Sequence, residues 1–121
     1  MAVDFEIWIK NQFAATGAFS AMIVLLNIDG DRLEPLKSTY VNVIGDELTW
    51  RDMKGLLGQA RVAWSGVAFF VAQSDGQPLP DGTAKAELRI IEQRVREDRM
   101  ALNDGFFFDT DGRMLRVDPV H

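Results

Sequence analysis

The chain has 121 residues, of which 47% are hydrophobic and 26% charged, and its formal net charge is −5. This length and composition are typical of one globular domain that folds without disulfides or a structural metal. The acidic balance disfavours nucleic-acid binding, because that binding depends on lysine and arginine side chains that neutralise phosphates. The sequence therefore predicts a single α+β domain spanning residues 1–121, with no nucleic-acid partner.

The residues used most often in catalysis are nearly absent. There is no cysteine, and the single histidine is His121. Thiol nucleophiles, thiolate metal sites and most imidazole acid–base chemistry are thereby excluded. No phosphate-binding glycine loop or other catalytic signature takes their place. We therefore expect no metal and no cofactor, assign no catalytic residue, and favour a protein that is not an enzyme.

The sequence shows no membrane or secretion signal. No basic run precedes an apolar one at the start of the chain. The longest apolar runs, Ala21–Leu26 and Val67–Ala72, have six residues each. A membrane span needs about 20 residues. We expect a soluble cytoplasmic protein that does not bind membranes.

Residues 4–15 fit two interpretations. Four large apolar residues share one face at helical spacing: Phe5, Trp8, Ile9 and Phe13. The same segment also alternates between apolar and polar residues, as a strand would. Asp4 is a plausible N-cap and Gly17 a plausible C-cap, so we favour the helix.

Two continuous apolar runs predict buried strands, at Ala21–Ile28 and Gly66–Gln73. The first run ends at the turn dipeptide Asp29-Gly30. We expect a further strand near Tyr40–Ile44. Pro35 has no amide hydrogen, and we expect it to keep the stretch before Tyr40 out of a central ladder.

The sequence predicts two further helices after this strand. Thr49 can cap a short helix that runs to about Ala60. Residues 74–82 are rich in Pro, Gly and Asp, and they predict a flexible loop. After this loop, an apolar stripe at helical spacing predicts one long helix from Thr83 to Leu102.

The chain is expected to end in a hairpin formed by residues 106–108 and 114–117, joined by a turn that contains Asp111-Gly112. The acidic pairs Asp29/Asp31 and Asp109/Asp111 are explained by turn chemistry without a metal. The full order is α-β-β-α-β-α-β-β. It predicts an α+β two-layer sandwich with a mostly antiparallel sheet and helices on one face.

The leading functional hypothesis is a module that binds itself, as a homodimer, or another protein. Its motivation is the missing catalytic chemistry together with a possible aromatic face at Phe5, Trp8 and Phe13. The alternative for that face is the core of this chain, because aromatic stripes at such spacing commonly pack inside. Under the binding hypothesis, alanine at both Trp8 and Phe13 is expected to disrupt assembly and leave the monomer folded.

The second functional hypothesis is a small-ligand binder or enzyme with a pocket between the sheet and the second helix. Trp50, Arg51 and Asp52 would stand at its mouth, and the loop at residues 74–82 would gate it. For Trp50 the alternative is again a place in the core.

Overall fold

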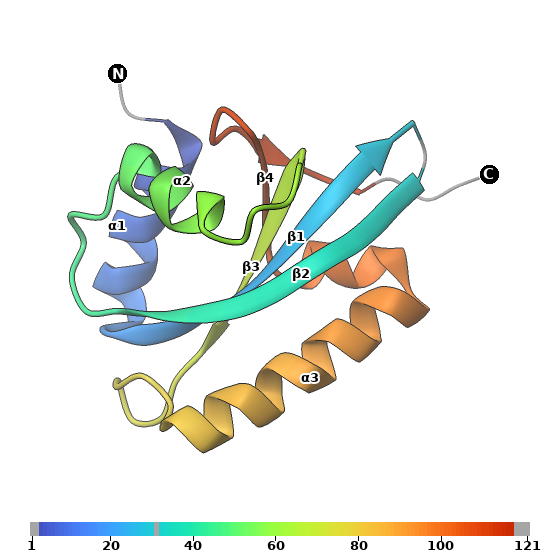
Figure 1. Cartoon of the computed structure of the whole chain (residues 1–121). Coiled ribbons are helices and arrows are strands. Elements are labelled where there is room, and N and C mark those ends of the chain that lie inside the picture. The colour runs from blue at the N-terminus through green and yellow to red at the C-terminus, as the bar shows by residue number, and fades with distance from the viewer. Residues whose placement is uncertain (1–2, 31, 118–121) are drawn as a thin grey trace.

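An antiparallel sheet lies in the middle of the molecule (Figure 1). The computed structural model describes residues 3–30 and 32–117. Within these residues the sheet has five strands: β1 Phe19–Asp29, β2 Arg32–Val43, β3 Gly66–Ala72, β4 Phe106–Asp109 and β5 Met114–Leu115. They lie in the order β2-β1-β3-β4-β5, and each neighbouring pair is antiparallel. The α+β class and the antiparallel sheet are thereby confirmed.

The helices are α1 Asp4–Thr16, α2 Trp50–Gly58 and α3 Asp81–Glu97, followed by the 3₁₀ helix η1 Arg99–Asp104. The helix interpretation of residues 4–15 is therefore confirmed. The predicted order α-β-β-α-β-α-β-β matches the chain, apart from the added η1. Among the residues that the structure describes, no helix is both long enough and apolar enough to cross a bilayer.

The prediction that the helices share one face of the sheet is wrong. Side chains of β1 alternate between two core clusters. Ile23 and Leu25 belong to a first cluster with α1 and α2, whereas Met22 and Val24 belong to a second cluster with α3 and η1. The physical reason lies in the continuous apolar run of β1. A strand that is apolar on both sides needs cover on both sides.

The strand predicted near Tyr40–Ile44 is longer than expected. β2 begins at Arg32, ends at Val43 and includes Pro35. The pairing register with β1 shifts between Leu25 and Leu26, which face Lys37 and Pro35 respectively. Proline is tolerated here because β2 is an edge strand and the irregularity leaves an extra residue in it.

The single helix predicted over residues 83–102 is interrupted at Asp98. Its backbone is extended, with φ −148° and ψ 109°, and its side chain accepts a hydrogen bond from the Met100 amide. An aspartate that bonds its own neighbouring backbone competes with helix continuation. The chain therefore leaves α3 at Glu97 and continues as η1.

Candidate functional site

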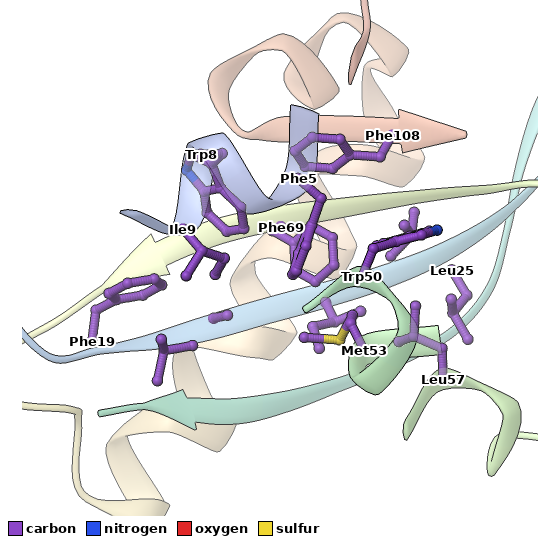
Figure 2. Close-up of a cluster of buried hydrophobic side chains, with 14 residues drawn as sticks. Phe5, Trp8, Ile9, Phe19, Leu25, Trp50, Met53, Leu57, Phe69 and Phe108 are labelled. Carbon is purple, nitrogen blue, oxygen red and sulfur yellow. The ribbon is translucent and has the colours of Figure 1, made fainter. Parts of the chain in front are cut away.

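The aromatic residues proposed for partner binding lie mostly inside the protein. Phe5 has an exposed fraction of 0% and Trp8 of 5%, whereas Phe13 is half-buried. The ring of Phe5 packs between three elements (Figure 2), with centroid distances of 5.1 Å to Trp50 and 5.4 Å to Phe69. Phe5 and Trp8 thus fill the core of their own chain, which was the alternative for this face.

Polar contacts fix the N-terminal end of α1 against two distant segments. The Glu6 carboxylate accepts a hydrogen bond of 3.0 Å from the amide of Trp50, at the start of α2. The Asp4 carboxylate accepts one of 2.9 Å from the amide of Met114 in β5. Sequence reasoning missed both roles, because the partners lie 44 and 110 positions away in the chain and leave no local pattern.

The three residues proposed for a pocket mouth divide between the core and the surface. Trp50 is buried, and its indole Nε1 donates to the carbonyl oxygen of Thr110 at 3.1 Å. Arg51 and Asp52 are exposed on the first turn of α2. Thr49 caps that turn by accepting from the Asp52 amide at 3.1 Å, as the sequence predicted.

A hollow does lie between the sheet and the other end of α2. We call it the α2 hollow, and its volume is about 400 Å³. Side chains of β1 and β2 form its floor: Ile23, Leu25, Thr39 and Val41. Residues in the last turn of α2 and just after it form its roof: Leu56, Leu57, Gln59 and Ala60. The hollow therefore adjoins α2, as one hypothesis required, but at the opposite end from Trp50.

Lys37 supplies a positive charge at the rim of the α2 hollow. It faces Leu25 across the β1–β2 ladder. Its Nζ donates to the carbonyl oxygen of Ala60 at 3.0 Å, across the hollow from β2 to the end of α2. Among the described residues that line the hollow, the other side chains are uncharged. The surface is thus mainly apolar, with one cation at its edge.

A second, more open depression runs along α1. We call it the α1 groove, and its volume is about 440 Å³. Its apolar lining includes Ile7, Trp8, Phe106 and Met114. Ile7 and Met114 are about half exposed, at 47% and 49%. The buried indole Nε1 of Trp8 finds no hydrogen-bond partner within the described part of the chain.

The loop proposed as a gate lies elsewhere. Gln73 donates to the carbonyl oxygens of Thr16 and Ala18, and the Leu79 amide donates to Ser20 Oγ at 2.9 Å. These contacts hold the segment against the end of α1 and the start of β1. Residues 74–82 do not contribute to the lining of the α2 hollow.

The acidic turns carry backbone contacts. The Asp109 carboxylate accepts from the amides of Asp111 and Arg113, at 2.8 and 3.0 Å, which is the turn chemistry expected. Asp31 lies outside the described residues. Across residues 3–30 and 32–117, no group of three His, Asp or Glu side chains is placed to hold a metal ion.

Comparison of the chain with protein-family models, with curated proteins and with solved structures found no match. We therefore base the functional proposals on the α2 hollow and the α1 groove.

Proposed function

We propose that this protein binds a small, largely apolar molecule in the α2 hollow. The observation that carries the proposal is a hollow of about 400 Å³ whose floor and roof are mainly aliphatic. Ligand pockets in proteins typically measure roughly 300–1,000 Å³ and combine apolar walls with a few polar groups. The absence of cysteine chemistry and of catalytic signatures favours binding over catalysis.

The arrangement of the walls supports the proposal. Ile23 and Leu25 of the floor and Leu57 of the roof belong to the buried first core cluster, so both walls of the hollow are continuous with the interior. Leu56 is 42% exposed and stands at the rim. A ligand that covered Leu56 would remove apolar surface from water, which favours binding by about 25 cal/mol per Å².

Filling the hollow tests the proposal. Thr39 is exposed and lies on the floor beside Ile23, and Phe is well tolerated in strands. We expect Thr39→Phe to weaken binding of octan-1-ol by about tenfold or more, a loss of about 1.4 kcal/mol. Binding is measured by NMR during titration, from shifts of the backbone amide signals of position 39 and of Leu56.

Thr83→Phe is the matched control, because Thr83 is exposed on α3 and lies outside the lining. This variant should bind octan-1-ol as the parent does. If the parent binds no octan-1-ol, or if it binds equally well after Thr39→Phe, the proposed function is wrong.

We propose self-association through the α1 groove as a second candidate function. The observation in its favour is the apolar lining of this groove, in which the side chains of Ile7 and Met114 are about half exposed. A second copy that covered these side chains would remove apolar surface from water, which favours association. A cytoplasmic location and the lack of a nucleic-acid partner also stay proposals, and the net charge of −5 supports the second.

The native mass of the untagged protein tests this candidate. We expect a whole multiple of the chain mass for the parent and a monomer for the double variant Ile7→Gln and Met114→Gln. Ile90→Gln is the control, since Ile90 is 54% exposed on α3. We choose these surface substitutions instead of alanine at both Trp8 and Phe13. Trp8 is buried, and Trp→Ala in a core lowers the free energy of unfolding by about 3–5 kcal/mol. A monomeric parent would contradict self-association.

A further inference from the structure

We propose that the occupant of the α2 hollow is an amphipathic anion, an aliphatic carboxylate whose head group is bound by the ammonium of Lys37. This inference rests on the proposed function and names the ligand class for that site.

The alternation of side chains along β2 determines which face of the sheet the Lys37 side chain lies on. Ser38 Oγ hydrogen-bonds the Glu92 carboxylate of α3 at 2.5 Å, so Ser38 points to the α3 face of the sheet. Its neighbour Lys37 must therefore point to the α2 face. The bond from Lys37 Nζ to the Ala60 carbonyl agrees with this direction. The amine is thus held at the opening of a mainly apolar hollow.

The ammonium keeps hydrogen-bonding capacity for a ligand. A lysine ammonium has three N–H donors, and the bond to Ala60 uses one of them. Lys37 is exposed, so its remaining donors face the rim and do not need to be desolvated deep inside the protein. Hydrogen bonds between a cation and a carboxylate are stronger than bonds between neutral groups.

The surrounding charges select an anion over a cation. Among the lining residues that the structure describes, Lys37 carries the one charged side chain. A cationic head group would face Lys37 and be repelled. A neutral head group would gain no ionic contact, so it provides the comparison that the test needs.

The test titrates octanoate and octan-1-ol, which share one chain length, into the parent protein and into Lys37→Gln. Binding is again followed by the amide signals of Thr39 and Leu56. We expect Lys37→Gln to weaken octanoate binding by about threefold to tenfold and to change octan-1-ol binding by less than about twofold. Lys37→Arg should restore octanoate binding. Lys54→Gln is the matched control, because Lys54 is exposed on α2 and lies outside the lining.

The outcomes separate this inference from the function on which it rests. If octan-1-ol binds the hollow but octanoate affinity is unchanged in Lys37→Gln, the head-group assignment is overturned and the proposed function stands. An equal loss for both ligands also overturns it, since Lys37 would then only support the shape of the hollow. If neither ligand binds the parent protein, both proposals fail.

Discussion

At the scale of single residues, the turn between β4 and β5 depends on the missing side chain of Gly112. Its φ is +77°, in the left-handed region that favours glycine. A Cβ built there would lie 2.9 Å from Cγ of Trp50. The same residue accepts a hydrogen bond from the Phe5 amide at 3.1 Å. Gly112 therefore lets the turn lie directly against the indole ring.

We expect Gly112→Ala to lower the free energy of unfolding by about 2–4 kcal/mol, because backbone strain and a steric contact add together. Gly55→Ala is the control within α2, where a Cβ would meet no atom within 4 Å. That change should raise stability by about 0.5–1 kcal/mol, since alanine favours helix interiors. Urea unfolding measures both. Equal effects of the two substitutions would contradict this account.

At the scale of elements, a polar cluster joins the edge strand β2 to the first turn of α3. The Tyr40 hydroxyl donates to the Asp81 carboxylate, which also pairs with Lys85 at 3.1 Å. The bond to Asp81 raises the pKa of Tyr40. The hydrogen bond from Tyr40 is the largest cause that lowers the pKa of Asp81, and the contact with Lys85 lowers it further. The contact therefore stabilises the fold while Asp81 is ionised and Tyr40 is protonated.

The pKa of Asp81 is lower in the folded state than in the unfolded state, so its contribution is present above the ordinary Asp pKa. It is lost as the pH falls through the lowered value. The raised pKa of Tyr40 acts in the opposite direction, and its contribution is lost at high pH. We expect Tyr40→Phe to be less stable than the parent at neutral pH, with the difference shrinking in acid. Urea unfolding across this range measures it, and a difference that grew in acid would contradict the assignment.

At the scale of the whole molecule, α1 completes the face of the sheet that α2 covers only in part. It contributes Phe5, Trp8 and Ile9 to the first core cluster (Figure 2). Fully burying one such side chain contributes about 1.5–3 kcal/mol. Three of them approach the total stability of a typical domain, which is about 5–15 kcal/mol.

We therefore expect a chain of residues 18–121 alone to lose cooperative unfolding. Circular dichroism during heating should show a broad transition in place of a sharp one. Adding a synthetic peptide of residues 1–17 at high concentration should restore the sharp transition, because the helix would dock on the same face. A shortened chain that unfolds as sharply as the parent would show that α1 is not required.

The candidate site shows how far sequence reasoning reaches. The sequence predicted a pocket next to the second helix with Trp50 at its mouth, whereas the α2 hollow lies at the other end of that helix. Its floor depends on which residues of β1 and β2 face each other, such as Ile23 and Thr39, and that register includes an irregularity near Pro35. Lys37 gave no signal, because a lone lysine in a strand looks like any solvated charge until its partner at Ala60 is known.

By itself, the sequence determined the element types and their order, because apolar periodicity and turn residues act over short distances. It determined the helix cap at Thr49 and the turn at Asp109 for the same reason. Only the tertiary structure decided that helices cover both faces of the sheet and that Phe5 and Trp8 are internal. It also decided which backbone groups Glu6 and Lys37 contact. These outcomes depend on contacts between segments far apart in the chain, and such contacts leave no periodicity in either segment.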